Sequence, residues 1–197
     1  MEKNIFSFEG NICGRDRAGI AGRLGMVFWL YGLSGSGKSV ISRLAEEKLF
    51  SMGILCYRLD GDNLRIGLNS DLGFSEKDRD ENIRRAAETA KLLADAGIIV
   101  ISAFITPLEE NRKTANDILG SLYNGVYVKC DIRTCIERDP KGLYKRAASG
   151  EIEDFTGISA PFEEGCGDEL VIDTVLHDAN ECADILVKFI LDKTALA

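Results

Sequence analysis

The segment from Gly32 to Ser39, GLSGSGKS, constrains the fold of this chain more than any other feature of its sequence. It matches the pattern G-x-x-x-x-G-K-[ST] in full. A loop of this kind needs a strand before it and a helix after it, because its backbone N–H groups must turn inward together. The apolar run Met26–Tyr31 precedes the segment, and an amphipathic stretch from about Lys38 to Met52 follows it. This context argues against the alternative, a flexible Gly/Ser turn.

The same segment predicts a binding site for the phosphates of a nucleoside triphosphate. Its glycines let the backbone approach phosphate oxygens, and the helix that follows aims its N-terminal dipole at the anion. Lys38 would bring a charge to the β- and γ-phosphates, and Ser39 a hydroxyl ligand for Mg²⁺. A basic excess between Arg133 and Arg146 indicates a second phosphate-handling segment. The predicted ATP-binding residues are Gly32, Leu33, Ser34, Gly35, Ser36, Gly37, Lys38, Ser39 and Arg138.

Short apolar runs alternate with helical patterns along the rest of the chain. Continuously apolar strands are typical of a parallel sheet that is covered on both faces. The pattern therefore predicts an α/β fold of the P-loop NTPase type, with three α/β/α layers and right-handed crossovers. The expected strands are Met26–Tyr31, Ile54–Leu59, Ile98–Phe104, Gly125–Cys130 and Leu170–Ile172.

Three further helices have recognisable ends. Ser75 is expected to cap a helix that reaches Ala96 and stops at Gly97. Thr106-Pro107 predicts a helix start, with Thr106 as the cap and Gly120 as the end. Asp178 and Glu181 resemble a capping box for the last helix.

The remaining segments suggest the domain organisation. Residues 1–25 are expected to form an N-terminal arm that packs on the domain or on a partner, and residues 26–197 to form the domain itself. The stretch from about 139 to 167 is Gly-rich and charged and fits no core element. A loop of that length inside a compact domain is usually functional, so we expect a lid there.

Composition narrows the classes of function. The net charge of -8 disfavours nucleic acid and anionic membranes as partners, since both require a basic face. No apolar run approaches the ~20 residues of a membrane helix, and the N-terminus lacks the pattern of a signal peptide. Six cysteines without a C-x-x-C pair, and one histidine, His177, argue against a zinc site. We therefore expect a cytoplasmic protein with free thiols.

Polar residues after the second strand and at the start of the next helix are candidates for chemistry. Asp60 and Asp62 follow a strand, and ligands of α/β sheets bind beyond the carboxyl ends of strands. These carboxylates would hold the water shell of Mg²⁺ or orient an attacking hydroxyl; a solvated turn is the alternative. Arg65 and Arg79 flank Phe74, and they suit phosphate or sulfate and a base, although a charged helix face would look the same.

The motifs DGDN, GFS-x-x-DR-x-EN and KGLY…DFTG are more specific than the phosphate-binding loop. Through them the chain resembles the adenylyl-sulfate kinase (APS kinase) family over roughly residues 10–175. The resemblance implies a P-loop kinase domain at 26–197 that transfers the γ-phosphate of ATP to the 3′-hydroxyl of adenosine 5′-phosphosulfate. The segments that carry it are GLSGSGKS (32–39), LDGDNLRIGLNSDLGFSEKDRDENIRR (59–85), ADAGIIVISAFITP (94–107), RDPKGLYKRAASGEIEDFTGI (138–158) and ELVIDT (169–174).

The resemblance also implies roles for individual residues, a homodimer, and ATP and Mg²⁺ as cofactors. Phe74 and Phe155 resemble the pair that sandwiches the adenine of the acceptor, and Lys141 resembles a lid residue that closes over both nucleotides. The implied catalytic residues are Lys38, Asp60, Asp62 and Thr106, with Ser39 as the Mg²⁺ ligand and Asp60 acting through water. The implied substrate-binding residues are Asp60, Asp62, Asn63, Arg65, Phe74, Arg79, Asn82, Ile105, Thr106, Lys141, Phe155 and Thr156.

The chain departs from the family pattern at a few positions. Thr106 stands where the family has a serine, often described as a phosphoserine intermediate, and Val40 stands where it usually has a threonine. Leu108 and Glu109 replace an aromatic and a basic residue, with Arg112 left to offset the charge. Two alternatives to an active APS kinase follow. One is a P-loop kinase for another small nucleotide, and the other is a nucleotide-binding regulatory subunit with weak or no catalysis.

Overall fold

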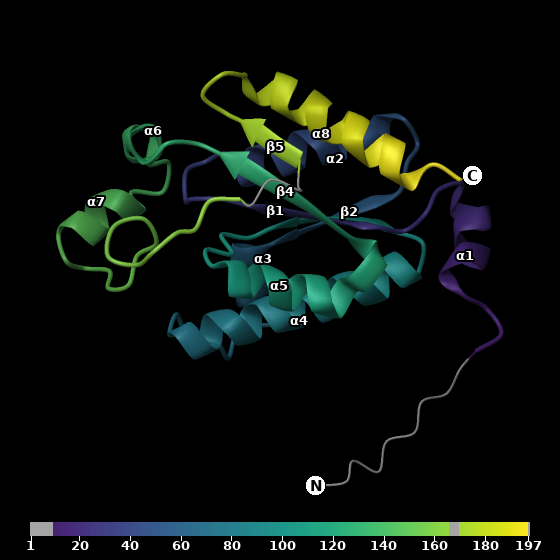
Figure 1. Cartoon of the computed structure of the whole chain (residues 1–197), viewed down its shortest axis with the longest axis horizontal. Helices are drawn as coiled ribbons and strands as arrows, with labels where there is room; N and C mark the ends of the chain where they lie inside the picture. The colour runs from purple at the N-terminus through teal and green to yellow at the C-terminus, as the bar shows by residue number, and fades with distance from the viewer. Residues whose placement is uncertain (1–9, 166–169, 197) are drawn as a thin grey trace, which may run out of the picture.

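The protein is described by a computed structural model that covers residues 10–165 and 170–196 (Figure 1). All five strands run parallel in one sheet, in the order β2-β3-β1-β4-β5. The predicted α/β fold with a parallel sheet is therefore confirmed. The strands are β1 Val27–Tyr31, β2 Cys56–Asp60, β3 Ile99–Ala103, β4 Tyr123–Lys129 and β5 Leu170–Asp173.

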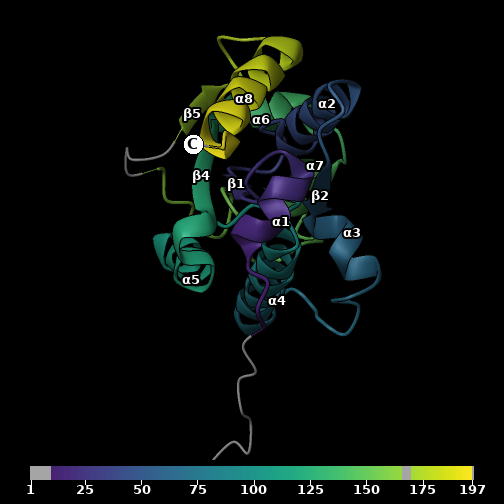
Figure 2. The same cartoon turned by 90° about the vertical axis from the view of Figure 1, so that its right-hand side faces the viewer.

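The long helices cover the two faces of the sheet (Figure 2). α2 (Lys38–Ser51) and α8 (Ala179–Thr194) lie on one face, and α4 (Glu76–Asp95) and α5 (Glu109–Leu119) lie on the other. β1 is buried along its whole length, because Trp29 points into the α4/α5 layer and its neighbours Phe28 and Leu30 point into the α2/α8 layer. This double burial explains why the strand is apolar without alternation.

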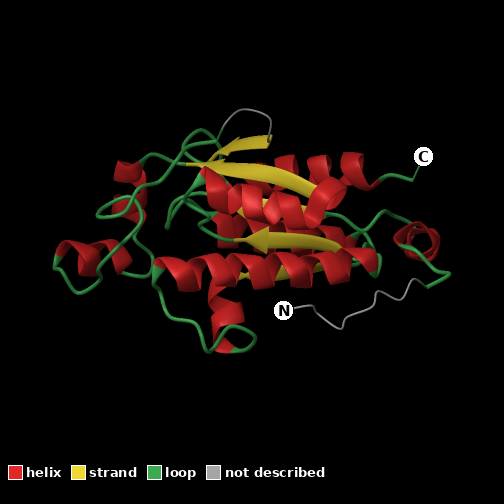
Figure 3. Ribbon diagram, turned by 60° about the horizontal axis from the view of Figure 1, so that its bottom comes forward, coloured by secondary structure: helices red, strands yellow, loops and turns green. Residues whose placement is uncertain are grey.

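Shorter helices gather at the ends of the sheet. α3 (Gly61–Ile66), α6 (Ile132–Arg138) and α7 (Leu143–Ala148) lie at the carboxyl ends of the strands, whereas α1 (Gly14–Ala21) lies at the opposite end (Figures 1 and 3). A 3-10 helix, Gly120–Leu122, joins α5 to β4. α7 lies in the stretch predicted as a lid loop, and α3 follows β2 where no helix was predicted, so the parts nearest the expected site contain more helix than predicted.

The predicted helix ends at Ser75, Gly120 and Asp178 are confirmed, and the predicted start at Thr106 is wrong. Ser75 caps α4 through Asp78 N at 3.2 Å, and Asp178 caps α8 by accepting from Asn180 N and Glu181 N. α5 ends at Gly120 as expected, but it begins at Glu109 with Leu108 as its N-cap. Thr106 cannot cap it, because the φ of Thr106 is 42° and its hydroxyl is engaged by Trp29.

The described part of the N-terminal arm packs on the domain. Arg17 forms an ion pair with Asp95 at the end of α4 (2.7 Å), and Ala18 is fully buried. Arg23 donates to Leu191 O and Thr194 Oγ1 on α8, at 3.1 and 3.2 Å. Residues 10–25 therefore join the ends of two helices on opposite faces of the sheet.

The described cysteines are free thiols, and the histidine lies at the start of the last helix. Five described cysteines, Cys13, Cys56, Cys130, Cys135 and Cys182, are free, whereas Cys166 lies outside the described residues. Burial raises the pKa of Cys56 to about 11, which keeps that thiol protonated. His177 is half-exposed and directly precedes the N-cap of α8. Across the described ranges, no helix is long and apolar enough to cross a membrane.

Candidate active site

The loop between β1 and α2 has the geometry of a phosphate cradle. Gly32 and Gly37 have φ of 149° and 105°, in the left-handed region that favours glycine. A Cβ on Gly32 would lie 2.5 Å from the carbonyl oxygen of Val128, so no other residue fits there. Gly37 is the N-cap of α2, and the free N–H groups of that helix start therefore face the loop.

Lys38 is buried over this loop. Its Nζ donates to Gly32 O at 2.8 Å and to Leu33 O at 2.6 Å. Burial lowers the pKa of Lys38 to about 8, since the ammonium loses its hydration and its hydrogen-bond partners, two carbonyls and the Ser36 hydroxyl, are neutral. A phosphate would supply the missing counter-charge, so the side chain is suited to an anion that enters the loop.

Ser39 and Asp60 place two oxygen atoms that could bind a metal close together at the carboxyl ends of the strands. Ser39 Oγ donates to Asp60 Oδ2 at 2.8 Å, and Asp60 Oδ1 accepts from Asp62 N at 3.1 Å as the N-cap of α3. Arg58 lies 3.6 Å from the same carboxylate and also contacts Glu46 on α2. Hydroxyl and carboxylate oxygens suit Mg²⁺, which keeps most of its water and phosphate ligands, so the donor set fits that ion.

The segment around α7 contacts α3 at one point and the phosphate-binding loop at two. Lys141 forms an ion pair with Asp62 on α3. Tyr144 Oη donates to Ser34 O at 2.9 Å, and its ring meets Phe155 edge-on at 5.0 Å. Phe155 is buried with Leu33 in the same cluster. The contacts of Tyr144 and Phe155 join this segment to the phosphate-binding loop, and the role of Tyr144 was not predicted.

Arg65 and Arg79 lie on either side of the chain at Phe74. Arg65 donates to Gly73 O at 2.6 Å, and its guanidinium carbon lies 4.5 Å from the centroid of the exposed Phe74 ring. Arg79 donates to Phe74 O at 2.9 Å and to Asp154 O at 2.8 Å, directly before Phe155. Burial and the neighbouring Arg79 lower the pKa of Arg65. Arg79 therefore connects the two segments that carry the predicted aromatic pair.

The other predicted residues differ in burial. Asn82 is buried and accepts from Asn69 Nδ2 at 2.9 Å, and Thr156 is buried beside Phe155. Asn63 lies in α3 and is exposed. Arg138 donates to Thr174 O at 2.7 Å and to Thr174 Oγ1 at 3.0 Å, and that hydroxyl donates to Ser36 O. Thr174 was not predicted, and it gives Arg138 its contact with the loop.

The turn after β3 closes the site beside β1. Gly32 N donates to Ile105 O at 3.2 Å, and Thr106 Oγ1 accepts from Trp29 Nε1 at 3.0 Å. Arg112 donates to Thr106 O, and it lies 4.6 Å from the centroid of the Tyr31 ring. Arg112 also donates to the carbonyls of Pro107, Glu163 and Glu164. This guanidinium therefore organises the turn, in contrast to the sequence expectation that it offsets Glu109 at a ligand.

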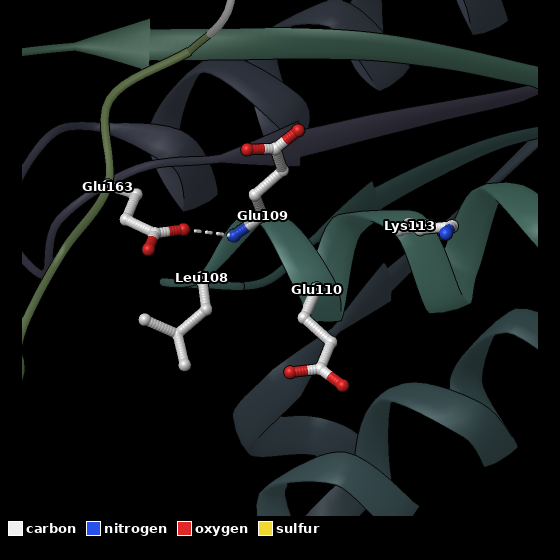
Figure 4. A pocket seen from close by; sticks show the side chains of 5 residues that line it. All are labelled: Leu108, Glu109, Glu110, Lys113 and Glu163. Atoms are coloured by element: carbon white, nitrogen blue, oxygen red, sulfur yellow. Dashed lines mark hydrogen bonds between the residues drawn. The ribbon is translucent and has the colours of Figure 1, made fainter.

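Glu109 lies beside a surface pocket of about 410 Å³ at the start of α5 (Figure 4). Its backbone N donates to the Glu163 carboxylate at 2.5 Å, and its own side chain points away from Leu108 and Glu110. The lining residues are Leu108, Glu109, Glu110, Lys113 and Glu163.

The chain is similar to known proteins of one family over most of its length. The family model described as adenylylsulphate kinase matches residues 24–173, which is most of the chain. The chain belongs to the adenylyl-sulfate kinase family. A relative from Bacillus licheniformis named adenylyl-sulfate kinase is 49% identical over 195 residues, covering 98% of this chain and 99% of its own length. A second, from Clostridium acetobutylicum, is 48% identical over 187 residues, covering 95% and 94%.

Solved structures of adenylyl-sulfate kinases have the same fold. The Mycobacterium tuberculosis APS kinase in complex with AMPPNP and APS superposes with a TM-score of 0.81 at 43% identity, covering 85% of this chain and 98% of that one. A hexameric APS kinase from Thiobacillus denitrificans gives a TM-score of 0.64 at 27% identity, over 87% of this chain and 29% of that one. A Sinorhizobium meliloti gluconokinase, at 14% identity and a TM-score of 0.60, shares the fold alone.

Proposed function

We propose that this protein is an active adenylyl-sulfate kinase, which transfers the γ-phosphate of ATP to the 3′-hydroxyl of adenosine 5′-phosphosulfate. The observation that carries the proposal is the convergence of two groups of residues at one end of the sheet. Lys38, Ser39 and Asp60 form the phosphate side, and Arg65 and Arg79 lie across α3 and α4 from it. The close relatives are named for this reaction.

Phosphoryl transfer requires mainly positioning and neutralisation of charge, and the geometry provides both. On the ATP side, Lys38 Nζ would exchange the carbonyls of Gly32 and Leu33 for phosphate oxygens. Ser39 and Asp60 would hold Mg²⁺, which would neutralise the negative charge of the phosphates. On the acceptor side, Asp62 would orient the 3′-hydroxyl, and its ion pair with Lys141 would bring the lid to the reacting groups.

The acceptor would be held by Arg65, Arg79, Asn82 and the turn at Ile105-Thr106. Phe74 and Phe155 supply the faces for the adenine, with Thr156 beside them; Phe74 is exposed, and Phe155 is already packed on Tyr144. We therefore propose that the Phe74 ring moves onto the adenine when the acceptor binds. Residues 139–167 would act as the lid that excludes water, which would otherwise hydrolyse ATP.

The proposal is tested by ADP release in a coupled assay with ATP and Mg²⁺, with and without adenosine 5′-phosphosulfate. We expect release that depends on the acceptor and forms the 3′-phosphorylated product. Lys38→Ala should lower kcat by roughly 100-fold or more, because it removes a charge that acts on the transferred phosphate. Tight binding of both nucleotides without turnover would instead indicate a regulatory subunit. Faster turnover of a nucleoside monophosphate would indicate a kinase for another nucleotide.

We also propose that the protein acts as a cytoplasmic homodimer. The free thiols support a reducing compartment, and the family resemblance supports the dimer. Light scattering coupled to size exclusion gives the mass directly, and a mass near 21.6 kDa, that of one chain, would contradict the dimer.

A further inference from the structure

Trp29 is the only tryptophan of the chain, and it contacts a residue of the proposed site. Its indole Nε1 donates to Thr106 Oγ1 at 3.0 Å, and the exposure of the two residues is 0% and 2%. The indole also stacks on Phe104, with 4.9 Å between the ring centroids and 17° between the planes. A buried and stacked ring has one orientation available, so this donor fixes where the hydroxyl oxygen of Thr106 lies.

Thr106 is held in a conformation that it would not adopt alone. Its φ of 42° is in the left-handed region, which is unfavourable for a β-branched residue. Strain of this kind persists only where the surroundings over-determine the backbone. Three hydrogen bonds do so here: Gly32 N to Ile105 O, Arg112 to Thr106 O, and Trp29 to Thr106 Oγ1. Two of the donors, Gly32 and Trp29, belong to β1 or to the loop that follows it.

We propose that Trp29 is a positioning residue that sets the direction of the Thr106 hydroxyl toward the acceptor nucleotide. A hydroxyl has one donor and two acceptor positions. Because Trp29 occupies an acceptor position of the Thr106 hydroxyl, the hydrogen of that hydroxyl points away from the indole. The hydroxyl would therefore donate a hydrogen bond to an anionic oxygen of the substrate. The inference rests on the proposed function, in which Thr106 contacts adenosine 5′-phosphosulfate. It also gives β1 a second role, since this strand then positions both the phosphate-binding loop and the acceptor contact.

The hydrogen bond has an optical signature that needs no turnover. Since Trp29 is the single tryptophan, the indole emission of the whole protein reports on it. Thr106→Val removes the hydroxyl at nearly constant shape, and Thr106→Ser retains it. We expect the emission maximum of Thr106→Val to move to shorter wavelength, with Thr106→Ser unchanged. Identical emission from wild type and Thr106→Val would overturn the proposal, even if the protein proved not to be a kinase for this acceptor.

Kinetics distinguish a positioning role from packing. Trp29→Phe retains a ring against Phe104 but removes the donor, so the KM for adenosine 5′-phosphosulfate should rise about fivefold to tenfold, the effect of one hydrogen bond, with the KM for ATP unchanged. Phe104→Leu weakens the same stack and leaves the N–H in place, so it is the matched control. Equal effects of the two variants, or an equal rise of both KM values in Trp29→Phe, would overturn the proposal. Should Trp29→Phe fail to fold, the emission of Thr106→Val decides alone.

Discussion

Lys38 is positioned to bind an anion, and the burial of its charge lowers the stability of the fold. Its ammonium is buried on the carbonyls of Gly32 and Leu33 without a carboxylate in hydrogen-bond contact. Arg112 is the contrasting case. It is also buried, but it donates to four carbonyls and lies over Tyr31, so its hydrogen-bonding capacity is used within the fold. The difference separates a residue placed for a ligand from one placed for structure.

The lowered pKa of Lys38 predicts a dependence of stability on pH. The unfolded chain binds this proton up to pH 10.5, whereas the folded chain releases it at about pH 8. The penalty for burying the charge is therefore present below pH 8 and is relieved between pH 8 and 10.5. We expect the free energy of unfolding of wild type, relative to Lys38→Met, to rise over this interval by an amount on the order of 3 kcal/mol. Urea unfolding of both proteins at several pH values measures it, and a flat difference would contradict the prediction.

At the scale of elements, close backbone approaches decide how the arm joins the domain. Gly25 connects α1 to β1, where a Cβ would lie 2.0 Å from the Ala94 carbonyl oxygen and 3.1 Å from the Cα of Gly97. No side-chain movement relieves such a contact, because both neighbours are backbone. The turn that ends α4 and the chain that enters β1 are therefore packed without room for a methyl group.

Gly25→Ala should consequently separate the arm from α4. We expect a loss of unfolding free energy of about 2–4 kcal/mol, in the range of severe backbone and overpacking changes. Gly19→Ala is the matched control, since a Cβ there meets nothing within 4 Å and alanine favours the helix α1. Thermal unfolding by circular dichroism compares the two. Equal transition temperatures for both variants would show that the arm contributes nothing to the stability of the domain.

At the scale of the whole molecule, the sequence predicted the elements that have a local signature. The apolar runs located the five strands of the described residues to within about two residues at each end, and Ser75 and Asp178 located two helix starts. The misplaced start of α5 has a non-local cause, since Thr106 is bonded to Trp29, 77 positions earlier in the chain. Tyr144 on Ser34 and Thr174 on Ser36 are missed for the same reason: pairs so distant along the chain leave no mark on either local sequence.

The proposed lid predicts where nucleotides change the motions of the molecule. Residues 141–158 are tied to the rest of the site by a few contacts, such as Lys141 to Asp62 and Arg79 to Asp154 O, and both side-chain partners of the ion pair are largely exposed. β1 is buried from end to end, so nucleotides can add little protection to its amides. AMPPNP with adenosine 5′-phosphosulfate should therefore slow amide hydrogen exchange in 141–158 by about tenfold or more, and leave β1 unchanged.

Lys141→Gln provides the matched variant for that measurement, because it keeps a polar side chain only one atom shorter and removes the charge. If the ion pair with Asp62 helps to close the segment, the variant should bind AMPPNP alone as wild type does and show less protection of 141–158 in the ternary complex. Equal protection in the two proteins would mean that the segment closes through Tyr144 and Phe155, which already pack on the phosphate-binding loop. Protection spread evenly over the sheet would instead indicate global stabilisation by ligand, with no lid at all.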